Sequence, residues 1–193
     1  MGLFDKIFNE GTNIARNAAN SVGSSLCNKS ETFTFQFLPE SVEQLKALPE
    51  ASLDTPFKTA ALTLCALCAW AASPAIGKDM LNFLKGPAPL MPGEISFINE
   101  RFRDNSPLLP FSYFEGAKPG NDYTPDKPFR VTITSNAYSK RDDTHFTVWI
   151  KSGGADNPRE VALRLKPSEG KWYLVEQHLL VGIREAKSAD PWA

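Results

Sequence analysis

The sequence has few of the residue types that usually carry metal, redox or acid–base chemistry. Its 193 residues include three cysteines and two histidines, and they contain no recognisable metal or cofactor motif. The formal net charge is −1, so the chain lacks the positive charge that nucleic-acid binding requires. No basic and apolar leader is evident, and an odd number of cysteines does not form a disulfide framework. We therefore expect a cytoplasmic protein without nucleic-acid partner, metal or cofactor.

The longest stretch without charge covers residues 59–77 and indicates one buried helix. Asp54 or Thr55 can cap this helix, and Pro56 fits its first turn. Leucines, alanines and Trp70 make it apolar nearly all round, which is typical of a helix in a core or in a membrane. Because the run consists mostly of small residues and lacks aromatic and basic flanks, we expect a core helix.

Cys65 and Cys68 within this stretch have the spacing of a redox CxxC motif. Such a motif needs the amino end of a helix, where a thiolate is stabilised, whereas these two cysteines lie in the middle of the predicted helix. We therefore interpret them as small packing residues.

Residues 1–25 predict a separate amphipathic helix. Apolar residues recur at three-to-four spacing, and the strongest cluster is Leu3, Phe4, Ile7 and Phe8. The polar positions carry two acids and two bases rather than the basic excess of membrane-surface helices. Two interpretations stay open: peripheral contact with a membrane surface, or packing on the chain's own domain or on a second copy in a homo-oligomer.

The remaining chain predicts a polar linker over 26–31 and a single α+β domain over 32–193. Strand-like alternation occurs at 32–38, with Phe33, Phe35 and Phe37 on one side, and again at 129–134, 145–151, 161–166 and 171–183. Helical patterns lie between the first strand and the others. Helices followed by sequentially adjacent strands predict three to four helices on one face of a four- to five-stranded antiparallel meander.

A long connection at 104–128 is rich in proline, glycine and aromatic residues. Connections of this length without regular structure are uncommon, and they are usually functional or disordered. Since disordered segments lack aromatic residues, we expect an ordered strap across the domain.

Period-two alternation assigns the strand residues to two faces of the sheet. The core face is expected to hold the apolar residues of each strand, including Tyr173, Val175, Leu179 and Val181 in the last one. The opposite face gathers aromatic and polar side chains of the kind that bind a ligand or a partner. The candidate binding residues on that face are His145, Trp149, Arg164, Trp172, Glu176 and His178.

Several phrases of the sequence occur together in one known family: TPFKTAALTL, SYFEGAKPGNDYTPDKPF, SGGADNPR, GIR and DPWA. From Phe33 to Ala193 the chain resembles an uncharacterised family of bacterial intracellular domains of unknown function. The resemblance implies a bacterial, cytoplasmic, single-domain protein. It implies no activity, cofactor or catalytic residue.

These observations favour a non-catalytic binding or scaffolding module. The sheet face and the strap would meet an unknown protein partner or small ligand, and residues 1–25 would mediate membrane-surface or self-association. The alternative is a cystatin-like α+β enzyme or small-molecule carrier, with a pocket around His145, Trp149, Trp172, Glu176 and His178. An enclosed pocket at these residues would favour the alternative, and a flat open face would favour the binding module.

Overall fold

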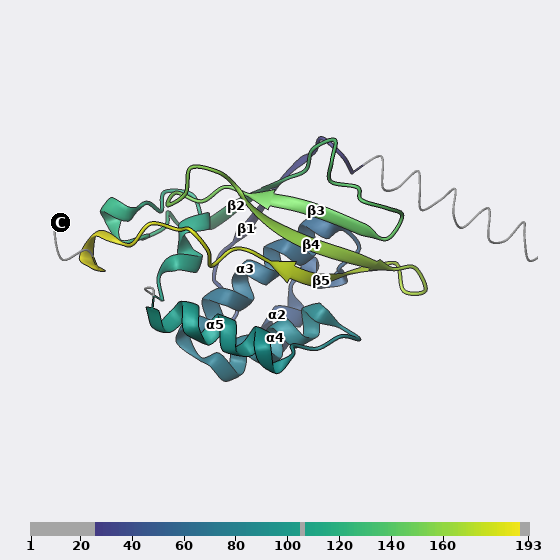
Figure 1. Cartoon of the computed structure of the whole chain (residues 1–193), viewed down its shortest axis with the longest axis horizontal. Helices are drawn as coiled ribbons and strands as arrows, with labels where there is room; N and C mark the ends of the chain where they lie inside the picture. The colour runs from purple at the N-terminus through teal and green to yellow at the C-terminus, as the bar shows by residue number, and fades with distance from the viewer. Residues whose placement is uncertain (1–25, 105–106, 190–193) are drawn as a thin grey trace, which may run out of the picture.

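A five-stranded antiparallel sheet forms the upper layer of the molecule in Figure 1. This computed structural model describes residues 26–104 and 107–189. The strand order is β1-β2-β3-β4-β5, so each strand pairs with its neighbours in sequence. The bounds are β1 Ser30–Phe35, β2 Phe129–Thr134, β3 His145–Ile150, β4 Arg159–Lys166 and β5 Lys171–Gln177. This sheet confirms the predicted meander.

The helices lie on the other side, below the sheet in Figure 1. Helix α3 packs directly against β2 to β5, and α4 packs against α3. The four α-helices of the described residues are α2 Val42–Ala47, α3 Pro56–Ala72, α4 Pro74–Lys85 and α5 Pro92–Asp104. The α+β class is therefore confirmed. The helix predicted over 1–25 lies outside the described residues.

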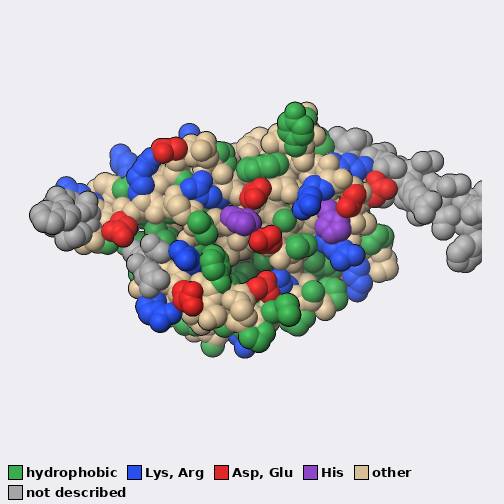
Figure 2. All heavy atoms as spheres, in the orientation of Figure 1, with side chains coloured by type: hydrophobic (Ala, Val, Ile, Leu, Met, Phe, Trp, Pro, Cys, Tyr) green, Lys and Arg blue, Asp and Glu red, His purple; other side chains and the backbone are tan. Residues whose placement is uncertain are grey.

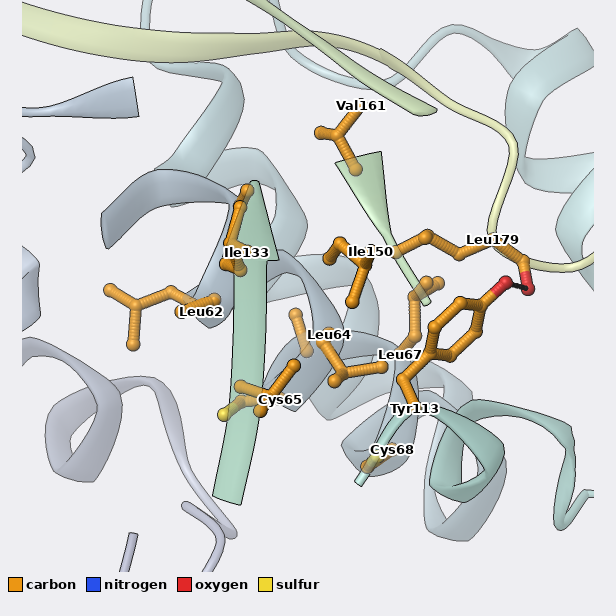
Figure 3. Close-up of a cluster of buried hydrophobic side chains, with 14 of the residues drawn as sticks. Leu62, Leu64, Cys65, Leu67, Cys68, Tyr113, Ile133, Ile150, Val161 and Leu179 are labelled. Carbon is orange, nitrogen blue, oxygen red and sulfur yellow. Dashed lines mark hydrogen bonds between the residues drawn. The ribbon is translucent and has the colours of Figure 1, made fainter. Parts of the chain in front are cut away.

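Helix α3 is the centre of the core, as its uncharged sequence predicts. Thr55 caps it by accepting a hydrogen bond from the amide of Lys58 at 3.3 Å. From Pro56 to Trp70 every residue except Lys58 is buried. The leucines of α3 pack against Ile133, Ile150 and other strand residues (Figure 3). Within residues 26–104 and 107–189, no helix has the length and apolar character needed to cross a membrane.

Strand β1 ends earlier than the alternation predicts. It begins at Ser30, inside the predicted linker, and stops at Phe35. Phe33 and Phe35 are buried as expected, but Phe37 lies beyond the strand and is 63% exposed. The prediction for Phe37 is wrong because alternation holds only while the backbone stays paired in the sheet.

Before its bulge, strand β5 presents the opposite side chains to the core from those predicted, whereas Glu176 beyond the bulge is exposed as predicted. Trp172 and Leu174 are buried, whereas Val175 is 42% exposed. The pairing with β4 shifts between Ala162 and Leu163, which leaves Val175 as the extra residue of a β-bulge. The placement of Trp172 on the outer face is therefore wrong, as is the placement of Tyr173 and Val175 in the core. Beyond the strand Leu179 is buried as expected, but Val181 is 39% exposed.

The connection from 107 to 128 is tied to the carboxyl-terminal segment rather than to the outer face of the sheet. It contains two short 3-10 helices, Leu109–Tyr113 and Pro119–Asn121. The hydroxyl of Tyr113 donates to the carbonyl of Leu179 at 2.7 Å, and that of Tyr123 donates to the carbonyl of Arg184 at 2.6 Å. These bonds hold residues 179–184 against the domain.

Candidate functional site

The outer face of the sheet does not bring its two histidines together. Strand pairing places His145 beside Arg164 and Tyr173, while Trp149 pairs with Glu160 at the other end of β3. The amide of His178 donates to the carbonyl of Glu160. The two rows are four residues apart along β3, which corresponds to about 14 Å. Figure 2 likewise shows two separate histidines on this face.

His145 belongs to a local loop structure. Its Nδ1 lies 2.9 Å from Oδ2 of Asp142, whose carboxylate also accepts hydrogen bonds from the amides of Thr144 and His145. The amide of Thr144, followed by its hydroxyl and by His145, holds the pKa of Asp142 well below its usual range. This cluster fixes the turn before β3, and His145 lines none of the grooves described below.

His178 lies between two carboxylates on the outer face. Its Nε2 is 3.4 Å from Glu176 and 3.9 Å from Glu160. All three side chains are at least 44% exposed, so these are solvent-screened contacts. Both contacts of the His178 imidazole are with carboxylates, and both lie at the solvent-exposed surface.

Trp172 is a core residue. Its ring meets that of Phe146 edge to face, with centroids 5.9 Å apart. Its amide donates to the carbonyl of Leu53 at 2.7 Å, and its carbonyl accepts from the hydroxyl of Thr59 at 2.7 Å. Trp172 therefore anchors β5 to the helical layer. It does not belong to the binding surface predicted on the outer face.

The main concavity lies between β5 and helix α5. This groove has a volume of about 540 Å³, and Figure 2 shows the hollow between the sheet and the helix below it. Three of its residues are exposed hydrophobics, Phe97 at 36%, Val175 at 42% and Val181 at 39%. Its other lining residues include Leu81, Leu90, Ile98, Leu174, Glu176 and His178. Two predicted site residues, Glu176 and His178, thus line an apolar groove.

A buried lysine lies against this groove. The side chain of Lys85 is 7% exposed, and its Nζ lies 2.6 Å from Oε1 of Glu94 and 3.0 Å from the carbonyl oxygen of Val175. Lys85 therefore joins α4, α5 and β5. Sequence reasoning missed it, although a signal exists: Lys85 follows Leu81 by four residues and so lies on the apolar face of α4.

The groove continues in both directions along β5. A hollow of about 410 Å³ shares Lys85, Leu174 and Val175 with it and extends to Arg164. A shallower hollow of about 300 Å³ shares His178 and Val181 and extends to Trp149. The three hollows share lining residues along β5, and together we call them the β5 groove. It contains four of the six predicted binding residues and excludes His145 and Trp172.

The described residues offer little for metal or thiol chemistry. Among them, no three histidine, cysteine or acidic side chains come together as metal ligands. Cys65 and Cys68 are buried in α3, and burial raises the pKa of both thiols. Thiols in this state are poor nucleophiles at neutral pH.

The comparisons with known proteins give a family without an assigned activity. Residues 37–187 match a family model described as a domain of unknown function, DUF6935. No curated protein and no solved structure matches the chain. The match covers well over half of the 193 residues and confirms the resemblance to an uncharacterised family. The chain therefore belongs to the DUF6935 family of domains of unknown function.

Proposed function

We propose that this domain is a non-catalytic protein-interaction module that binds an amphipathic helix of a partner protein in the β5 groove. The observation that supports this proposal is the clustering of exposed apolar side chains. Phe97, Val175 and Val181 are three of the six large hydrophobic residues exposed among the described residues, and all three line one channel. Clustered exposed apolar surface of this kind marks interaction sites.

The shape of the groove favours an elongated occupant. The lining follows β5 from Tyr173 to Gln177, a length of about 17 Å, and the groove is open to solvent on one side. Apolar walls with charged groups at the rim suit a helix with one apolar face, which inserts side chains at three-to-four spacing. Glu94 and Glu176 supply charges at the rim, and His178 adds a polar side chain beside them.

Strand addition to the edge of the sheet is a less suitable mode. Strand β5 is an edge strand, but part of its outer backbone is already paired within the chain. Trp172 uses both its amide and its carbonyl, and the carbonyl of Val175 accepts from Lys85. The bulge at Val175 further disrupts the regular spacing that an added strand needs.

In this proposal the outer sheet face contributes one end of the site, through Trp149 and His178. The strap acts indirectly, because Tyr113 holds Leu179 and thereby the segment that carries Val181. The enzyme alternative has no comparable support, because His145 and Trp172 do not lie with the other residues of its pocket. We place the module in the cytoplasm, in line with an odd number of cysteines, which does not form a disulfide framework.

The test is selection of binders from a displayed library of amphipathic helical peptides, using the full chain as target. The dissociation constants of the enriched peptides are then measured by fluorescence polarisation. We expect Phe97→Asp to abolish binding and Phe37→Asp to leave it unchanged, since both phenylalanines are exposed but only Phe97 lines the groove. The proposal would be overturned if the enriched peptides bound Phe97→Asp with unchanged dissociation constants, or if the selection enriched no peptide.

A further inference from the structure

We infer that the β5 groove is occupied by the chain's own amino-terminal segment, residues 1–22, within the same molecule. The groove is then a self-occupied site, and a partner helix must displace this segment. The inference rests on the proposed function, because it assigns a particular amphipathic helix to the same groove.

The sequence of the segment matches the requirements of the groove. Leu3, Phe4, Ile7 and Phe8 form an apolar stripe at three-to-four spacing, the pattern by which helices anchor in apolar grooves. Lys6 and Arg16 are the cations among its polar positions. The polar positions also carry Asp5 and Glu10, and the groove is lined by acids and bases alike, so the apolar stripe is what matches the segment to the groove.

The described chain begins at the end of the sheet where Ser30, Trp149 and His178 lie in one row across the strands. The carbonyl of Leu26 accepts from Oγ of Ser135 at 2.6 Å, next to the start of β1. Strand pairing then runs in one row from Ser30 through Thr134 and Trp149 to Glu160. His178 continues this row through its bond to Glu160, and it lines the groove.

The distance along this row is within reach of the segment. Four strand spacings separate Ser30 from His178, which is about 19 Å. A helix over residues 3–22 is about 30 Å long. A helix that leaves the domain near Leu26 and crosses the row at Trp149 can therefore place its first turns, which carry the apolar stripe, in the groove.

A tether this short favours the segment of the same molecule over that of a second copy. Residues 23–25 join the segment to the described domain, and short tethers give effective concentrations of the order of millimolar. The same segment of a second copy, present at micromolar concentration, therefore competes poorly with the tethered segment for the groove.

The first experiment is photo-crosslinking in the full chain with benzoylphenylalanine in place of Phe8. Met91 is 68% exposed beside Leu90 of the groove and is a reactive acceptor for this probe. We expect crosslinks within one molecule to residues 90–98 or 174–181, mapped by mass spectrometry, and their loss in Phe97→Asp. The same probe in place of Asn13, a polar position, is the control and is expected not to reach the groove.

Three results would overturn the inference. Crosslinks between two molecules would assign the segment to a second copy, and crosslinks to the surface around Phe37 would assign it to a different groove. Binding of the full chain to anionic lipid vesicles, combined with no crosslink to the groove, would assign the segment to a membrane surface.

A second experiment separates failure of this inference from failure of the proposed function. A full-length variant with Phe4→Ser, Ile7→Ser and Phe8→Ser is expected to bind the selected peptides roughly tenfold or more tightly, because no tethered competitor remains. Unchanged affinity overturns only the self-occupied groove. If neither chain binds any peptide in the groove, the proposed function fails as well.

Discussion

The hydroxyl of Tyr113 donates a 2.7 Å hydrogen bond to the carbonyl of Leu179, and both residues are buried (Figure 3). The bond joins the strap to the segment that follows β5. Burial raises the pKa of the Tyr113 phenol, so this hydroxyl stays protonated and keeps donating across the physiological pH range. Together with Arg159, whose Nε donates to the carbonyl of Val181 at 2.7 Å, Tyr113 fixes the position from which Val181 enters the β5 groove.

Tyr113→Phe is expected to lower the free energy of unfolding by about 1–3 kcal/mol, because the buried Leu179 carbonyl loses its donor. Urea denaturation measures this change. Tyr138→Phe is the matched control, since Tyr138 is 85% exposed, and its stability is expected to stay unchanged. Equal stability of Tyr113→Phe and the native chain would show that the strap does not hold this segment.

Those parts of the fold that depend on local chemistry could be predicted from the sequence. The uncharged run predicted α3, and Thr55, one of the two expected caps, accepts a hydrogen bond from the backbone amide of Lys58 at 3.3 Å. The strand periodicity predicted the meander, because each strand pairs with a sequence neighbour. No long-range information was needed for these elements.

The parts that depend on strand register could not be predicted. The bulge opposite Ala162 and Leu163 shifts the faces of β5, and nothing in the local sequence marks it. Trp172 therefore lies in the core, while four of the six predicted residues line the β5 groove and His145 belongs to the turn before β3. The β5 groove was missed because it forms between elements far apart in sequence, and Lys85 and Val175 meet only in the folded chain.

Leu67 is fully buried in α3 beneath the strands (Figure 3) and gives a direct test of the core. Leu67→Ala is expected to lower the free energy of unfolding by about 2–5 kcal/mol through lost burial and a cavity. Leu67→Met keeps the volume and is expected to lower it by less than about 1.5 kcal/mol. Urea denaturation of both variants is the measurement. Equal effects of alanine and methionine would show that α3 is not the centre of the core.

The Lys85–Glu94 pair makes a prediction about α5. Glu94→Leu leaves the Lys85 ammonium buried without its carboxylate and is expected to destabilise the chain by about 2 kcal/mol. The expected loss of stability is smaller than that from breaking a fully buried ion pair, because Glu94 is 38% exposed. The double variant Lys85→Met, Glu94→Leu removes both charges and is expected to be more stable than Glu94→Leu alone.

The measurement is the free energy of unfolding in urea of Lys85→Met, Glu94→Leu and the double variant, which together form a double-mutant cycle. The exposed pair between Lys58 and Asp54 is the control, and Asp54→Ala is expected to change stability by less than about 1 kcal/mol. A double variant less stable than Glu94→Leu would mean that Lys85 stabilises the chain even without its carboxylate, through its bond to the Val175 carbonyl.

Asp142 links the stability of the turn before β3 to pH. Hydrogen bonds from the amide of Thr144, its hydroxyl and His145 lower the pKa of Asp142 from its ordinary value of 3.8. A carboxyl group with a lowered pKa stabilises the folded state above its unfolded-state pKa, and this contribution disappears as the pH falls through the folded-state pKa. Asp142→Asn is therefore expected to be less stable than the native chain at neutral pH, with a difference that shrinks in acid.

The measurement is urea denaturation of both chains from neutral pH to below 3.8, the ordinary aspartate value, together with a carboxyl NMR titration of Asp142. Asp143→Asn is the control, because Asp143 contacts Lys140 at 3.2 Å and takes no part in the Thr144 hydrogen bonds described here. A stability difference for Asp142→Asn that stays constant with pH would show that the carboxylate charge does not stabilise the turn. In that case the loss would come from the changed hydrogen-bonding group, an amide in place of a carboxylate, and not from its charge.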